Sequence, residues 1–141
     1  MTTSRAEAER VSAALTDALQ SADRDRLEAV IDPAATLWHN TDQVESTGAE
    51  LVTAVVDIGA VCSISLSVGR VGVTDTGFLQ TQEWTFRTAA GAALTIHSSF
   101  DITLGPDGRV IRLDEYVDSS ALTALGELVA DGARHAASAV T

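Results

Sequence analysis

A change in the spacing of apolar residues after Gly59 is the feature that most restricts how this chain can fold. Beyond this glycine, apolar and small polar residues alternate one by one, first at 62–68. Alternation with a period of two is typical of a β-strand that buries one face. Three similar segments follow at 78–87, 93–104 and 109–117, and only short turns separate them. The sequence therefore predicts four consecutive antiparallel strands.

The chain before this glycine has the longer spacing of helices. Apolar residues recur every three or four positions over 4–20, which predicts an amphipathic helix. A short second helix is expected from Asp23 to the Asp-Pro pair at 32–33, because the residue before a proline disfavours helical backbone angles. A strand is expected at 35–40. A third helix is expected to begin at Thr47, which has the spacing of a capping box with the glutamate three residues on.

A last helix, expected at 119–139, completes the element order. Helices that precede and follow an antiparallel meander define an α+β domain in which the helices pack on one face of the sheet. With 141 residues, 45% of them hydrophobic, the chain has enough apolar material for one core. We expect a single domain over 1–141, with a cone-shaped, curved, mixed or antiparallel sheet that encloses a pocket at its wide end.

The charge of the chain bears on its partners and its location. A net charge of −11 repels nucleic-acid phosphates and anionic lipid surfaces, so neither nucleic acid nor a membrane is an expected partner. The first residues lack the basic and then apolar pattern of a signal peptide, and apolar stretches such as 51–56 are too short to span a bilayer. A cytoplasmic location is expected.

The sequence contains no motif that is typical of cofactor binding or of covalent catalysis. Cys62 is the only cysteine, and its place in an alternating segment favours a buried structural residue over a catalytic thiol. No histidines stand at metal-ligand spacing, and the glycines at 105–108 belong to a hairpin turn. We expect neither a metal ion nor a cofactor.

Alternation also assigns residues to the pocket. In the last strand Glu115 shares a face with Leu113, Val117 and Ile111, which is the apolar and therefore inward face. Burial among aliphatic side chains disfavours the charged form of a carboxylate, which suits a general acid or base. Glu115 is therefore the first catalytic candidate. A glutamate displaced to the strand end by a bulge is an equally weighted alternative.

The two preceding strands supply candidate substrate-binding residues. Gln82 and Trp84 lie on the aromatic face of 78–87, which is expected to point inward and to combine apolar walls with a few polar groups. Phe100 lies on the inward face of 93–104. His97 falls on the outward face of that strand, and it stays a candidate because a bulge could turn it inward.

The first strand completes the expected site. Trp38 and Asn40 share one side and His39 takes the other. We expect Trp38 to form a wall of the pocket, and Asn40 to orient the substrate or a water molecule together with Gln82.

Two segments, 37–42 and 108–118, together with the element order, resemble the nuclear transport factor 2-like superfamily. The similarity is to its SnoaL-like branch, which includes ketosteroid isomerases, polyketide cyclases and limonene-epoxide hydrolases. The resemblance implies a homodimer that packs the outer face of the sheet, which suits Arg112, Asp114 and Tyr116.

The epoxide hydrolases offer the nearest enzymatic comparison. Their aromatic-x-Asn motif is similar to Trp38-His39-Asn40, and their terminal Asp-Tyr-x-Asp is similar to 115–118, which implies an acidic catalytic position at Glu115. Their Arg-x-Asp pair would fall at 82–84, where the sequence reads Gln-Glu-Trp. In the isomerases, the catalytic aspartate of the first strand would fall near His39 or Asn40.

Three hypotheses for function follow. The first is an enzyme that uses acid or base catalysis, without a cofactor, in the isomerisation, cyclisation or epoxide opening of an apolar metabolite. The second is a module of the same fold that binds a small apolar ligand without changing it. The third is a dimerisation domain whose own side chains fill the pocket.

Overall fold

The computed structural model describes residues 2–140, and these form four helices and six strands. In chain order they are α1 (Arg5–Ser21), α2 (Arg24–Val30), β1 (Ile31–His39), β2 (Glu45–Thr47), α3 (Gly48–Gly59), β3 (Cys62–Val73), β4 (Gly77–Thr88), β5 (Ala93–Leu104), β6 (Val110–Val117) and α4 (Ser119–Val140). The predicted α+β order is confirmed. One strand is added, because β2 forms between the expected strand at 35–40 and the third helix.

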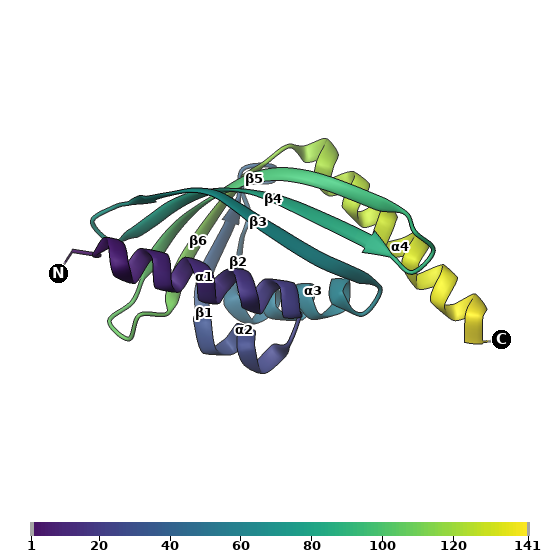
Figure 1. Ribbon diagram of the computed structural model, residues 1–141, viewed down its shortest axis with the longest axis horizontal. Coiled ribbons are helices and arrows are strands. Elements are labelled where there is room, and N and C mark those ends of the chain that lie inside the picture. Colours follow the sequence, from purple (N-terminus) through teal and green to yellow (C-terminus); the bar gives the residue numbers. More distant parts are fainter. Residues whose placement is uncertain (1, 141) are drawn as a thin grey trace.

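The strands form one open sheet in the order β2-β1-β6-β5-β4-β3. The sheet is mixed, since β1 and β6 are parallel while every other neighbouring pair is antiparallel. Figure 1 shows the long strands arching over α1, α2 and α3, with α4 near one end of the arch. The parallel pairing of β1 with β6 matters most for the site, because it places the first strand of the chain next to the last one.

Three of the helices begin at a capping residue that the sequence supplies. The side-chain oxygens of Ser4, Asp23 and Thr47 each accept a hydrogen bond from the backbone N–H three residues on, which satisfies a donor that the helix itself cannot. The hydroxyl of Thr47 also donates to the carboxylate of Glu50 at 3.2 Å. Helix α1 ends at Ala22, whose left-handed backbone turns the chain toward α2.

The core lies between the concave face of the sheet and the helices. Residues of α1 such as Leu15 and Leu19 are fully buried, as are Phe78 and Ile102 on the facing strands β4 and β5. Cys62 is buried and unpaired, and burial raises the pKa of its thiol, which fits the expected structural role. The inward faces predicted for β3, β4 and β5 are confirmed by their alternating burial.

A bulge corrects one part of the face predicted for β6. Leu104 of β5 pairs with Val110, whereas the preceding Thr103 pairs with Arg112, so Ile111 is the extra residue. Val110 is consequently buried and Ile111 is 38% exposed. The inward face expected from Ile111 onward therefore begins only at Leu113.

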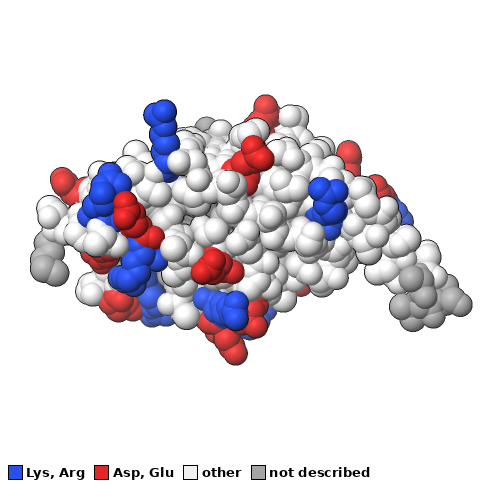
Figure 2. Space-filling view, viewed as in Figure 1, with Lys and Arg blue, Asp and Glu red and all other residues white. Residues whose placement is uncertain are grey.

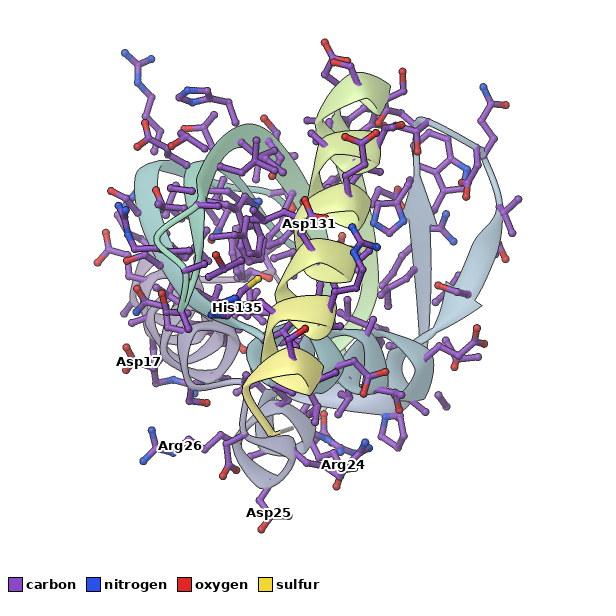
Figure 3. The ribbon with its side chains drawn as sticks, turned by 90° about the vertical axis from the view of Figure 1, so that its right-hand side faces the viewer. Asp17, Arg24, Asp25, Arg26, Asp131 and His135 are labelled. Atoms are coloured by element: carbon purple, nitrogen blue, oxygen red, sulfur yellow. The ribbon has the colours of Figure 1, made fainter. Side chains whose placement is uncertain are left out.

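The surface and the helices complete the description. On the face drawn in Figure 2, charged side chains of both signs gather mainly over the first half of α1 and over α2. Figure 3 shows the molecule from one end. In this view α4 crosses in front of the curved sheet and carries the labelled residues Asp131 and His135. His135 is exposed, as is Asp131, which pairs with Arg134. Within residues 2–140 no helix is both long and apolar enough to cross a membrane.

Candidate functional site

A cavity of about 190 Å³ lies under the arch of the sheet. Helices α1, α3 and α4 close it from below and from the end, and the inner faces of β1 and β3 to β6 form the rest. Its lining is aliphatic and aromatic apart from two side chains: Leu19, Leu37, His39, Leu51, Ala54, Val55, Ile58, Ile64, Trp84, Phe86, Ile96, Phe100, Leu113, Glu115, Val117, Leu122 and Leu125. Such a pocket suits a mostly apolar molecule that carries a polar group at one point.

The two polar lining residues, His39 and Glu115, form an ion pair. Their strands are parallel neighbours, and the register sets His39 opposite Glu115. The imidazole Nε2 lies 3.1 Å from the carboxylate Oε1, and the two side chains are 27% and 13% exposed. The site therefore depends on a contact between residues 76 positions apart, which only the parallel pairing of β1 with β6 creates.

The electrostatics of this pair favour a charged histidine. The hydrogen bond to Glu115 raises the pKa of His39 above its ordinary value of 6.5, although burial acts in the opposite direction. The charges of Glu115 and Asp42 raise it further. The site thus favours the protonated form of His39 more than water does, which suits a side chain that gives up a proton.

A buried hydroxyl holds the other carboxylate oxygen. Ser98 Oγ donates to Glu115 Oε2 at 2.9 Å and accepts from Trp84 Nε1 at 3.0 Å and from Gln82 Nε2 at 2.8 Å. One proton and two lone pairs are all that a hydroxyl offers, so its hydrogen-bonding capacity is fully used. Ser98 is consequently a positioning residue for Glu115, and its proton is not free for nucleophilic activation.

The hydrogen bonds continue behind Ser98 into the core. Gln80 Nε2 donates to Gln82 Oε1 at 2.7 Å, and Ser12 Oγ of α1 donates to Gln80 Oε1 at 2.8 Å. All four residues of this chain, Ser12, Gln80, Gln82 and Ser98, are at most 7% exposed. Buried polar groups are tolerated when each has a partner, and here the partners form one continuous chain.

The direction of this chain follows from its two fixed ends. A carboxylate can only accept and an indole N–H can only donate, so Ser98 must donate to Glu115 and accept from Trp84. Gln82 must then present its NH₂ group to Ser98 and its carbonyl to Gln80. The same reasoning turns the NH₂ group of Gln80 toward Gln82 and makes Ser12 the donor. Every donor therefore points along the chain toward Glu115.

The structure places four of the predicted residues on the inner side of the sheet. Glu115, Trp84 and Phe100 line the cavity. Gln82 is buried on the same face, and it reaches the site only through Ser98. Trp84 also stacks on Phe86 at 5.6 Å between ring centroids, so the indole is part of the wall and of the hydrogen-bonded chain at once.

The face predicted for the first strand was wrong. Trp38 lies on the outer face, edge-on to Tyr116 at 5.6 Å, and His39 is the residue that enters the cavity. Asn40 is exposed, and its Oδ1 accepts a hydrogen bond from the backbone of Val117 at 2.9 Å, so it holds the end of β6. The reason is the alternation of β1, in which Ala35 and Leu37 are buried and His39 follows them on the same side.

His97 also lies outside the cavity. The bulge that could have turned it inward is absent, because β4 and β5 pair without a shift from Gly77 to Arg87. Its side chain is 77% exposed and faces Glu83, with Nε2 3.8 Å from the carboxylate. Together with Asn40, it borders a broad open hollow of about 600 Å³ on the outer face of the sheet.

Sequence reasoning missed His39 and Ser98. The alternation of Ala35, Leu37 and His39 could have identified the histidine, but Trp38 and Asn40, on the opposite side of the strand, were the residues expected to face inward. Ser98 shares the inward face of its strand with Phe100, and nothing in the sequence distinguishes it there. A serine in a strand does not indicate a site by itself. Its role is visible only once Gln82, Trp84 and Glu115 surround it in the folded structure.

Comparison with known proteins concerns the fold. No protein-family model matches the chain, and no curated protein sequence does either. Solved structures do match it. A putative SnoaL-like polyketide cyclase from Shewanella denitrificans is 9% identical with a TM-score of 0.71, over 88% of this chain and 98% of that one. An epoxide hydrolase from M. tuberculosis, similar to limonene-epoxide hydrolase, is 18% identical with a TM-score of 0.64, over 90% and 92%.

A third structure extends the comparison to the isomerases. It is a hypothetical protein with a ketosteroid isomerase-like fold from Catenulispora acidiphila in complex with trimethylamine, 8% identical with a TM-score of 0.68, over 82% of this chain and 90% of that one. The chain therefore has the fold that these structures share. At these identities the likeness is one of fold, and function has to be argued from the site.

Chemistry at the site rests on few groups. Among residues 2–140, no three side chains of histidine, cysteine, aspartate or glutamate come together as a metal site would require. The groups that face the cavity and can exchange a proton are His39 and Glu115. The arrangement can therefore remove a proton from a bound molecule and return one to it.

Proposed function

We propose that this protein is an enzyme that moves a proton on an apolar small molecule, with Glu115 as the general base and His39 as the general acid. The observation that carries the proposal is the ion pair of these two residues at the polar end of an apolar cavity. Isomerisation, cyclisation and epoxide opening can each use a base and an acid placed in this way. Proton transfer by a positioned side chain typically contributes a factor of about 10² to 10⁴ in rate.

Two of these reactions balance with these two groups: the deprotonation of a ketone that begins an isomerisation, and the opening of an epoxide. With an enolisable ketone, the carboxylate of Glu115 takes a proton from the carbon next to the carbonyl, and the electron pair of that C–H bond forms the enolate. With an epoxide, Glu115 takes a proton from water while the water oxygen bonds to carbon and the ring C–O bond breaks. His39 then gives its proton to the released oxygen. Both carboxylate oxygens of Glu115 keep lone pairs for this purpose beyond those used by Ser98 and His39.

Deuterium exchange tests the base directly. The protein is incubated in D₂O with single-ring enolisable ketones such as cyclohexanone, and the loss of the hydrogens next to the carbonyl is followed by proton NMR. Cyclohexene oxide and conversion to its diol test the epoxide arm. We expect Glu115→Gln to slow the reaction by about 10² or more, because the amide cannot accept the proton.

Glu83→Gln is the matched control for this substitution. Glu83 also pairs with a histidine, but on the outer face of the sheet. We expect this variant to exchange at the wild-type rate. Equal rates for wild type and Glu115→Gln on any accepted substrate would remove Glu115 from the mechanism.

One observation favours a second function, that of a module that binds a ligand without changing it. Both oxygens of Glu115 are already engaged, by Ser98 at 2.9 Å and by His39 at 3.1 Å, so the carboxylate also fits a purely structural role. Under this alternative the protein binds the same ketones and epoxides, and all of them are recovered unchanged and without deuterium.

A further inference from the structure

The size of the cavity limits what it can hold. Its volume is about 190 Å³, below the roughly 300–1,000 Å³ of most ligand pockets. An apolar cavity of about 150 Å³ in another protein binds benzene. The space under this sheet thus matches one six-membered ring with a small substituent better than two fused rings.

Helix α4 supplies the wall that closes this space. Leu122 and Leu125 are the residues through which it borders the cavity. Farther along the helix, Gly132 lies so close to the sheet that an added Cβ would come within 3.3 Å of Thr88 and Val61. The helix is therefore docked closely at this point.

The charges around the cavity select against ionic ligands. When His39 is protonated, its charge and that of Glu115 neutralise each other, and the other lining side chains are uncharged. A carboxylate or ammonium group in this space would lose its hydration without gaining an unused counter-charge, which is strongly unfavourable. A neutral oxygen can instead accept or donate a hydrogen bond at the ion pair.

We propose that the ligand is a neutral molecule of single-ring size with one polar oxygen, and that Leu122 and Leu125 of α4 set this size limit. The inference rests on the proposed function only in placing the ligand in this cavity. Its test measures binding without turnover, so it can fail or succeed independently of catalysis.

The two tryptophans provide the measurement. The indole N–H of Trp84 is at the cavity wall, whereas Trp38 lies on the outer face against Tyr116, so the two side-chain NMR signals act as probe and internal reference. Trp84→Phe assigns them. We expect cyclohexanone to shift the Trp84 signal in a saturable manner and to leave that of Trp38 in place. Benzoate, cyclohexylamine and the two-ring ketone 1-decalone should leave both unchanged.

Variants of α4 then test the size limit. Leu125→Ala should admit 1-decalone and change the preference for it over cyclohexanone by about tenfold or more, since each methylene group in an apolar pocket is worth roughly that factor. Leu122→Ala is the second variant in case the first does not fold. Leu128→Ala is the matched control, because Leu128 lies on the same helix and packs on the core outside the cavity lining.

Three outcomes would overturn the inference. The first is equal binding of 1-decalone and cyclohexanone to the wild-type protein. The second is binding of benzoate or cyclohexylamine at Trp84 with an affinity equal to that of the ketone. The third is a change of preference in Leu128→Ala as large as in Leu125→Ala.

Discussion

The two faces of the sheet each carry a histidine and a glutamate in contact, and the two pairs differ in almost every other respect. On the inner face, His39 and Glu115 are 3.1 Å apart and 27% and 13% exposed. On the outer face, His97 and Glu83 are 3.8 Å apart and 77% and 51% exposed. An exposed pair of this kind is typically worth about 0–1 kcal/mol, because water screens the charges and the side chains lose freedom.

The surroundings of the glutamates explain the difference. Glu115 is held on its second oxygen by a chain of buried donors that reaches back to Ser12 of α1, and it faces an apolar cavity. Glu83 lies among exposed residues of the outer face. The same two residue types thus form a candidate catalytic pair on one side of the sheet and a weak surface contact on the other. Burial and hydrogen bonding decide which of these two roles a pair can have.

Packing is expected to give the largest difference in stability between a substitution on the inner face and one on the outer face. Phe78→Ala should lower the free energy of unfolding by about 3–5 kcal/mol, because Phe78 is 0% exposed and its removal leaves a cavity. Leu79→Ala, one residue on, should change it by less than about 0.5 kcal/mol, since Leu79 is 49% exposed. Urea unfolding of both variants measures this. Similar losses would show that the outer face of β4 is also packed.

A smaller contrast is expected from hydrogen bonding in β5. Ser98→Ala removes the group that joins Gln82, Trp84 and Glu115, and a buried polar group left without a partner costs about 1–3 kcal/mol. Ser99→Ala on the outer face should stay within about 0.5 kcal/mol. Urea unfolding again provides the comparison. A neutral effect of Ser98→Ala would mean that water replaces the hydroxyl.

The smallest contrast is in the pH dependence of stability. Glu115 raises the pKa of His39 in the folded protein, so the stabilisation by protonated His39 is complete below the ordinary value of 6.5. It is lost as the pH rises through the raised value. The stability difference between wild type and His39→Gln should therefore be larger at pH 6 than at pH 9, by less than about 1 kcal/mol.

His97→Gln is the control for this experiment. Its exposed pair should give little stability at either pH. Thermal unfolding at the two pH values would show the difference. A gap for His39→Gln that is constant or that grows toward pH 9 would contradict the proposed ion pair.

Sequence patterns predicted most of the helices and strands, and they predicted the part of the site that β4 and β5 form. The alternation of β4 and β5 placed Gln82, Trp84 and Phe100 on the inner face because these strands pair without a shift. Patterns failed where the backbone departs from regular alternation or where the partner strand is far away. The bulge at Ile111 is one such place. The side that β1 presents to the cavity is another, since Trp38 was expected there and His39 occupies it.

The sequence by itself determined which segments become strands and helices, and that an apolar face with a glutamate near its end would be buried, because periodicity and capping act over a few residues. Only the tertiary structure decided that β1 lies parallel to β6, which sets His39 against Glu115. It also decided that Ser12, Gln80, Gln82 and Ser98 connect behind that pair. Such contacts join residues tens of positions apart, and their partners are defined only when the sheet has closed over the helices.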